Sequence, residues 1–105
     1  MLVLTRFRVP AAEEPSFVER AQAAIAVLRQ RAGLLSLDFG RNLDEPDLWV
    51  LTTRWENVGA YRRALSSYDV KLHGIPVLSR ALDEPGAYEV VRPGTTLNEY
   101  GARGT

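Results

Sequence analysis

Residues 48–57 read Leu-Trp-Val-Leu-Thr-Thr-Arg-Trp-Glu-Asn, and this stretch decides the fold. Its first four residues are all apolar, so a strand built from them presents apolar side chains on both of its faces. Trp55 ends the strand, and Asn57 is a suitable N-cap for a following helix that carries Tyr61. The pattern predicts a central strand that is covered on both sides and leads directly into a helix.

The N-terminal third of the chain predicts a strand followed by a helix. Residues 2–9 alternate between two faces, as a strand requires, and apolar residues then recur at helical spacing over residues 17–32. Ser16 and Glu19 fit a capping box at the start of this helix. Gly33 fits the position where a helix stops. The residues expected on one face of the strand are Val3, Thr5, Phe7 and Val9.

Three further elements complete the predicted pattern. Residues 34–43 alternate as a second strand, and the acidic turn at 44–47 connects them to the apolar strand. After that strand we expect a broken helix, because Gly74 and Pro76 interrupt its regular spacing. Residues 87–92 are predicted to form the last strand.

The order strand, helix, strand, strand, helix, strand predicts an α+β fold of the ferredoxin-like type, with a βαββαβ order and an antiparallel sheet. Both helices then cover the same face of the sheet. Leu48 and Val50 point to the opposite face, where their exposure to water would create an apolar patch that promotes association with other molecules. We therefore expect a homodimer whose sheets face one another as a dimeric α+β barrel, with an interior that accommodates a small hydrophobic or aromatic ligand.

Composition narrows the classes of function. The chain of 105 residues fits one domain over residues 1–92, and residues 93–105 lack periodicity and are expected to form a C-terminal tail. Thirteen basic and thirteen acidic residues balance, which speaks against nucleic acid and against an anionic membrane surface as partners. No apolar run approaches the ~18 residues of a membrane span. The absence of cysteine excludes thiolate catalysis and zinc–thiolate sites, and it fits a cytoplasmic protein.

Three residues after the apolar strand are candidates for chemistry. Trp55 either fills the core or stacks on a planar substrate. Tyr61 either donates a hydrogen bond to a substrate oxygen or lies with its hydroxyl at the surface. His73 is the only histidine, so it is a candidate general base, although a histidine beside Gly74 also fits a helix end. We assign His73 and Tyr61 as candidate catalytic residues and Trp55 as a candidate substrate-binding residue.

Two charged residues lie on predicted strands. Arg6 and Asp38 either pair with one another or lie in solvent at strand ends, because buried charges need partners. Both are candidate substrate-binding residues. One histidine without cysteine does not make a closed metal site, so we predict no metal. No glycine-rich phosphate loop is present, and nothing in the sequence indicates a nicotinamide or flavin cofactor.

The segment Leu51-Thr52-Thr53-Arg54-Trp55-Glu56-Asn57, followed by Ala60-Tyr61, resembles the antibiotic biosynthesis monooxygenase family of dimeric α/β-barrel proteins. The resemblance covers about residues 2–92. It implies that Trp55 and Tyr61 line the pocket, as in the members that oxidise polyketides. The chain differs from those members at Leu51, where they carry Asn, and at Ile75, where they carry Arg.

The resemblance implies a cofactor-independent monooxygenase that oxidises a small aromatic or polyketide-like substrate with molecular oxygen. His73 or Tyr61 would assist proton removal, and the electron-rich substrate would itself supply the electrons. The alternatives are a non-catalytic ligand-binding or structural homodimer and a haem-handling or isomerase relative of the same fold. A cavity of roughly 300 Å3 or more, reached by a polar group, would favour the enzyme.

Overall fold

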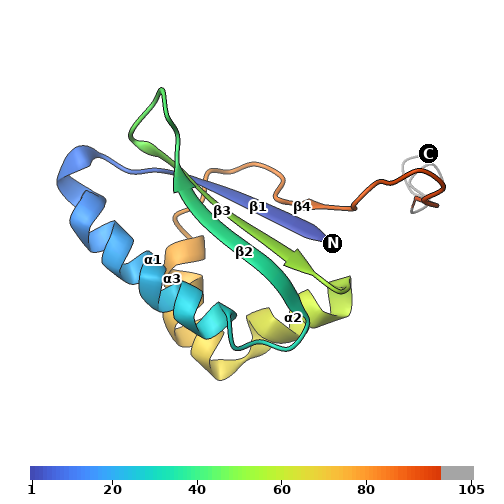
Figure 1. Cartoon of the computed structure of the whole chain (residues 1–105). Helices are drawn as coiled ribbons and strands as arrows, with labels where there is room; N and C mark the ends of the chain where they lie inside the picture. Colours follow the sequence, from blue (N-terminus) through green and yellow to red (C-terminus); the bar gives the residue numbers. More distant parts are fainter. Residues whose placement is uncertain (98–105) are drawn as a thin grey trace.

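The computed structural model describes residues 1–97, which form a four-stranded antiparallel sheet with helices packed on one face (Figure 1). The strand order in the sheet is β2-β3-β1-β4. The predicted ferredoxin-like α+β fold is confirmed. The strands are β1 (Leu2–Arg8), β2 (Leu34–Arg41), β3 (Leu48–Trp55) and β4 (Ala87–Tyr88). The main helices are α1 (Glu14–Leu28), α2 (Val58–Ser66) and α3 (Ile75–Leu78).

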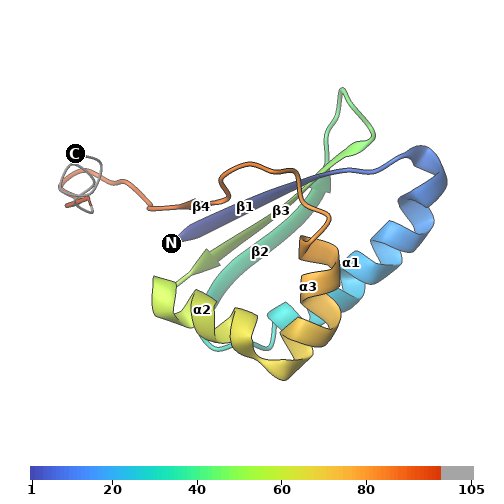
Figure 2. The same cartoon turned by 180° about the vertical axis from the view of Figure 1, so that it is seen from behind.

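β3 is a central strand, with β1 on one side and β2 on the other. Its side chains alternate between the two faces of the sheet, as the pleat of a strand requires. All three helices lie on the same face, as the two opposite views show (Figures 1 and 2). The β3 side chains turned toward the helices are all buried, and they are Trp49, Leu51, Thr53 and Trp55.

The first helix begins earlier than the sequence predicts. The capping box assigned to Ser16 and Glu19 is wrong, because Ser16 lies inside the first turn and its hydroxyl donates to the carbonyl of Glu13 at 3.1 Å. Pro15 occupies that first turn, where its missing N–H leaves no helical hydrogen bond unmade. The predicted apolar stripe is nevertheless buried through Phe17, Ala21, Ala24, Ile25 and Leu28.

Gly33 closes the turn that leads from α1 to β2. Its backbone has a φ of +91°, and a Cβ at this position would collide with the Cβ of Ala60 on α2. The carbonyl of Gly33 also accepts a hydrogen bond from the amide of Glu56 at 2.9 Å. Only glycine allows both this conformation and this close approach, which fixes the start of α2 against the end of α1.

The predicted break in the second helical segment is confirmed. α2 ends at Ser66, the backbone of Ser67 is extended, and a π-helical turn over Val70–Gly74 then leads into α3. Gly74 packs closely on Val70, since a Cβ on Gly74 would lie 3.0 Å from the Val70 side chain. Pro76 lies in the first turn of α3, where proline is tolerated.

The last strand is shorter than predicted. The prediction of a strand over residues 87–92 is wrong beyond Tyr88. Tyr88 pairs with Leu2, which is the first residue of β1, so the pairing between the two strands stops where β1 begins.

The predicted tail at residues 93–105 lies only partly within the described chain. A tight turn forms at its start, in which the amide of Thr95 donates to the carbonyl of Arg92 at 2.9 Å. Residues 98–105 lie outside the described residues, and the boundary at residue 92 stays a prediction. No helix found within residues 1–97 is long and apolar enough to cross a membrane.

The sheet face away from the helices carries a mixture of apolar and charged side chains. Leu4 and Val50 are half-buried there, beside Arg6 and Arg8 of β1. No helix among the described residues covers this face (Figure 2). The second subunit that is expected to cover this face stays a prediction.

Candidate functional site

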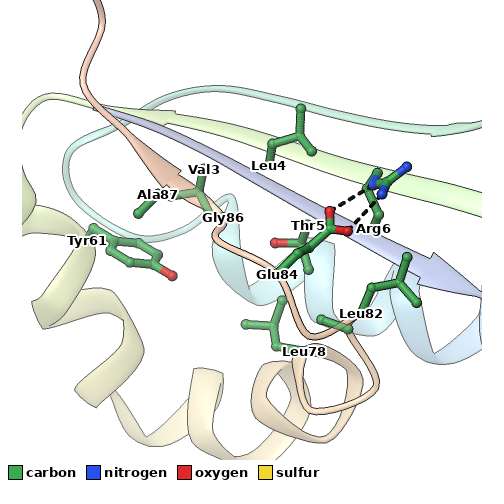
Figure 3. A pocket seen from close by; sticks show the side chains of 11 residues that line it. Val3, Leu4, Thr5, Arg6, Tyr61, Leu78, Leu82, Glu84, Gly86 and Ala87 are labelled. Carbon is green, nitrogen blue, oxygen red and sulfur yellow. Dashed lines mark hydrogen bonds and ion pairs between the residues drawn. The ribbon is translucent and has the colours of Figure 1, made fainter.

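A cavity of about 310 Å3 lies between the sheet and the C-terminal half of the helical layer. Side chains from β1, α2, α3 and residues 81–87 line it (Figure 3). Apolar residues outnumber polar ones in the lining, although polar and apolar surface contribute about equally, and the polar side chains are those of Thr5, Arg6, Tyr61 and Glu84. A hollow that combines apolar walls with a few polar groups is typical of a small-molecule site.

A strap formed by residues 82–86 makes the outer wall of this cavity. It is held to the edge of β1 at its two ends. The amide of Leu82 donates to the carbonyl of Arg6 at 2.8 Å, and the amide of Leu4 donates to the carbonyl of Gly86 at 2.7 Å. Gly86 lies so close to β1 that a Cβ there would be 2.9 Å from the Leu4 carbonyl oxygen. Between these two hydrogen bonds the strap runs away from β1, and this separation makes room for the cavity.

A bidentate ion pair bridges β1 and the strap. The Nε and NH2 groups of Arg6 donate to the two carboxylate oxygens of Glu84 at 2.8 and 2.7 Å. The hydrogen bond from Arg6 lowers the pKa of the Glu84 carboxyl below its ordinary value, so this group is ionised at neutral pH. Both side chains are partly exposed, which places the pair at the surface opening of the cavity.

Tyr61 enters the cavity from α2. The helix is started by Asn57, whose side-chain oxygen accepts a hydrogen bond from the amide of Ala60 at 2.8 Å. Burial raises the pKa of the Tyr61 hydroxyl above its ordinary value of 10.0. Tyr61 is therefore a neutral phenol at pH 7 and acts as a hydrogen-bond donor. It also faces a wider groove of about 770 Å3 between α2 and residues 87–96.

Trp55 lies behind Tyr61, with the two ring centroids 5.7 Å apart. It is almost completely buried, and its indole N–H donates to the hydroxyl of Thr53 at 2.9 Å. A second hollow of only about 20 Å3 lies at this point, lined by Thr5, Thr53, Trp55 and Tyr61 together with apolar side chains. Trp55 thus packs against the ring of Tyr61 beneath the site, and it does not line the cavity of about 310 Å3.

The model of the antibiotic biosynthesis monooxygenase family matches residues 1–73 of this chain. The chain belongs to this family. The match includes β1, β3 and α2, and therefore Arg6, Trp55 and Tyr61. No curated protein matches the chain.

Solved structures of the same fold support this placement. SnoaB, a cofactor-independent oxygenase from Streptomyces nogalater, is 22% identical with a TM-score of 0.72, over 93% of this chain and 96% of SnoaB. Rv0793 from Mycobacterium tuberculosis is 21% identical with a TM-score of 0.67, over 94% and 96% of the two chains. A conserved protein from Methanosarcina mazei is 19% identical with a TM-score of 0.68, over 82% and 84%. At these identities the likeness shows a common fold.

The structure brings together only some of the residues that the sequence singles out in this member of the monooxygenase family. Tyr61 and Arg6 line the same cavity, and Trp55 supports it from behind. His73 is exposed in the π-helical turn and lines none of the hollows described above. Asp38 is exposed on the uncovered face of β2, and it pairs with neither Arg6 nor another charged residue in the described chain.

Thr5, Thr53 and Glu84 are site residues that the sequence does not single out. The two threonines were detectable in principle, because strand alternation turns their hydroxyls toward the helices among apolar neighbours. Glu84 carries no such signal, since it reaches Arg6 across 78 residues of sequence. Within residues 1–97 no group of three or more His, Asp or Glu side chains is placed to hold a metal ion.

Proposed function

We propose that this protein is a cofactor-independent monooxygenase that oxidises a small aromatic or polyketide-like molecule with O2. The observation that carries the proposal is the cavity of about 310 Å3, into which Tyr61 projects from the segment shared with the family. Its apolar walls suit a planar ring system, and its few hydroxyls suit the oxygen atoms of such a molecule.

The proposed reaction converts a CH2 carbon next to aromatic rings into a carbonyl. Loss of one proton gives an enolate-like carbanion, which transfers an electron to O2. The two radicals combine to a peroxide anion, which takes up a proton from water to form a hydroperoxide, and loss of water then leaves the C=O group. One O2 is consumed, one of its oxygen atoms enters the product and the other leaves as water. The substrate supplies all four electrons, so the scheme uses no external reductant.

In this scheme Tyr61 stabilises negative charge on the substrate oxygen. Its raised pKa makes it a donor at neutral pH and a poor base. A hydrogen bond to the developing oxyanion favours the carbanion over the neutral substrate, which is how a neutral donor lowers the barrier to proton loss. We leave His73 out of the proposed machinery, because its exposed position gives it no access to this cavity. The proton would pass to water at the opening.

We also propose that the protein is a cytoplasmic homodimer. Support comes from the uncovered sheet face, where Leu4 and Val50 are only half-buried and share one surface with charged residues. A two-fold arrangement would bury this surface on both subunits at once. Sedimentation equilibrium at micromolar concentration is expected to give twice the monomer mass, and a stable monomer would overturn the dimer.

Oxygen consumption with anthrone tests the enzymatic proposal. This probe carries a CH2 group between two aromatic rings, and its oxidation gives anthraquinone and water. We expect the protein to consume one O2 per anthrone above the autoxidation rate in buffer, and to transfer one 18O atom from 18O2 into the quinone. Tyr61→Phe should lower turnover by about 10²-fold, as loss of one oxyanion donor does elsewhere.

Tyr68→Phe is the matched control, because Tyr68 is also a tyrosine of the second helical segment but is 76% exposed. It should leave turnover unchanged. Oxygen consumption no faster than the buffer rate would remove the enzymatic proposal. If anthraquinone still bound under those conditions, the non-catalytic ligand-binding dimer would take its place.

A further inference from the structure

Tyr61 lies where the hollows of this protein meet. Among residues 1–97 it alone lines the cavity of about 310 Å3, the groove of about 770 Å3 and the small hollow beside Trp55. Ala87 is also common to the cavity and the groove, and Figure 3 shows it with Tyr61 at one end of the cavity. Its side chain lies on the helix side of the sheet, because Ala87 pairs with the core residue Val3. The cavity and the groove thus adjoin on the side that the helices cover.

One face of α2 forms the first wall of the groove. The residues of this wall follow helical spacing, and they are Val58, Tyr61, Arg62 and Leu65. Ala60 and Ala64 of the same helix are buried against the core instead. The wall is therefore mostly apolar and carries one positive charge, that of Arg62, directly after Tyr61. A molecule that extends from the cavity past Tyr61 into the groove meets this guanidinium.

The chain after β4 forms the second wall of the groove. Residues 89–97 leave the sheet and continue past the N-terminus (Figure 1). A turn closed by two hydrogen bonds holds Arg92 in this wall. The amide of Arg92 donates to the hydroxyl of Thr95 at 2.8 Å, and the amide of Thr95 donates to the carbonyl of Arg92 at 2.9 Å. Arg92 thus lines the groove from the side across from α2.

The two arginines of the groove differ from most arginines near the other elements. Arg62 and Arg92 are exposed, and the ion pairs found within residues 1–97 involve neither of them. The arginines that do hold acidic partners are Arg6, Arg8, Arg41 and Arg80. Glu89 is the one acidic residue in the described lining, so positive side chains outnumber negative ones there. A groove with apolar walls and two such arginines is suited to a chain that ends in an anion.

We propose that the groove binds a flexible, anionic chain attached to the aromatic part of the substrate, with Arg62 and Arg92 as its anion contacts. This inference rests on the cavity being the substrate site proposed above. The ring system would lie in the cavity, the chain would pass Tyr61, and its carboxylate would reach the two arginines. The substrate would then be an aromatic acid whose carboxylate is separated from the rings by several carbon atoms.

Calorimetric titration with two pairs of naphthalene probes tests the inference without any turnover. The short pair is 2-naphthoate and 2-naphthamide, and the long pair is 6-(2-naphthyl)hexanoate and its amide. The wild-type protein should prefer the long acid over the long amide by about fivefold, which is the effect of one exposed ion pair. It should show no preference for the short acid, because the short carboxylate does not extend past Tyr61.

Substitutions on the two walls test the assigned contacts. Arg62→Gln and Arg92→Gln should each reduce the preference for the long acid, and the double variant should abolish it. Arg63→Gln is the matched control, because Arg63 is an exposed arginine of α2 that lines none of the three hollows. It should keep the preference. A loss in Arg63→Gln as large as that in Arg62→Gln would mean that the general surface charge attracts the acid, and it would overturn the site.

The remaining outcomes distinguish this inference from the function on which it rests. Equal binding of the long acid and the long amide by the wild-type protein would overturn the anionic chain and leave the aromatic site in place. An equal preference for the acid in the short pair would place the anion contact within the cavity and overturn the role of the groove. A preference that survives the double variant, shown to be folded by circular dichroism, would overturn the two arginines as contacts. Failure of every probe to bind would overturn the inference and the proposed site together.

Discussion

The two tryptophans of β3 lie on the same side of the sheet, yet their surroundings differ. Trp49 belongs to a compact group of aromatic rings whose centroids are 5.2–6.0 Å apart. Trp55 has one aromatic neighbour in the described chain, Tyr61, and its indole donates to the hydroxyl of Thr53 beside the small hollow. The group around Trp49, called the aromatic cluster below, consists of Phe7, Phe17, Phe39 and Trp49.

Charged residues close the aromatic cluster from outside. The guanidinium of Arg41 lies 5.6 Å from the Trp49 ring and that of Arg80 lies 5.6 Å from the Phe17 ring. Each arginine is also held by a glutamate at the start of α1. At this end the rings fill the space between sheet and helix. At the Trp55 end, smaller side chains and the strap leave this space open. The Trp49 end therefore stabilises the fold, whereas the Trp55 end has room for a ligand.

The largest expected effect comes from the aromatic cluster. Phe17→Ala should lower the free energy of unfolding by about 3–5 kcal/mol, because a buried ring that contacts three other rings is replaced by a cavity. Urea unfolding followed by circular dichroism measures the change. Oxygen consumption with anthrone should persist in the protein that stays folded. A loss below about 1 kcal/mol would show that this end is not the packed one.

The second effect tests the hydrogen bond beneath the cavity. Thr53→Val keeps the size of the side chain but leaves the indole N–H of Trp55 buried without its acceptor. We expect a loss of about 1–3 kcal/mol in the free energy of unfolding, the usual consequence of an unsatisfied buried donor. In a protein that already carries Trp55→Phe, Thr53→Val should cost less stability, because the donor that needs the threonine hydroxyl is absent there.

Trp49→Phe is the matched control for that experiment. The indole nitrogen of Trp49 is buried and has no hydrogen-bond partner in the described chain. Its replacement removes an unpaired donor, so only packing is lost. Coupling between Thr53→Val and Trp49→Phe should be within about 0.5 kcal/mol of zero. A coupling as large as that with Trp55 would mean that the threonine acts through packing.

Much of this arrangement was predictable from local sequence patterns. Alternation in β1 and β3 and the apolar stripe of α1 are enforced by burial on one side, so they can be recognised without the structure. The motif that ends at Tyr61 predicted that this tyrosine and Trp55 both line a pocket, and the structure has Tyr61 in the lining of the cavity and Trp55 behind it. These features depend on neighbours that lie close in sequence.

The features that escaped prediction depend on distant contacts. The length of β4 depends on where its partner β1 begins. Glu84 becomes a site residue because the fold brings it next to Arg6. The position of His73 follows from the π-helical turn, which buries Val70 and Gly74 and leaves the imidazole in solvent. The sequence predicted a break in this helical segment, but it did not predict that the break would expose the side chain of His73.

A third, smaller effect concerns Tyr61 and alkaline pH. Burial raises its pKa, so the folded state holds the phenol proton at a pH where the unfolded chain has lost it. The stability contributed by the neutral phenol is complete below pH 10 and is lost as the pH rises through the folded-state pKa. Between pH 8 and 11 the wild-type protein should therefore lose stability relative to Tyr61→Phe, as measured by urea unfolding. A difference that does not change with pH would contradict the buried placement of the hydroxyl.

The smallest effect is expected at the ion pair over the cavity opening, and it has the opposite dependence on pH. Arg6 lowers the pKa of Glu84, so the ionised pair favours the folded state above the ordinary pKa of 4.5. That contribution is lost as the pH falls through the folded-state pKa of Glu84. The stability difference between the wild-type protein and Glu84→Gln should be constant near neutral pH and shrink in acid. A difference that grew on acidification would show that the carboxyl stabilises the strap in its protonated form, which would leave Arg6 free of its built-in partner.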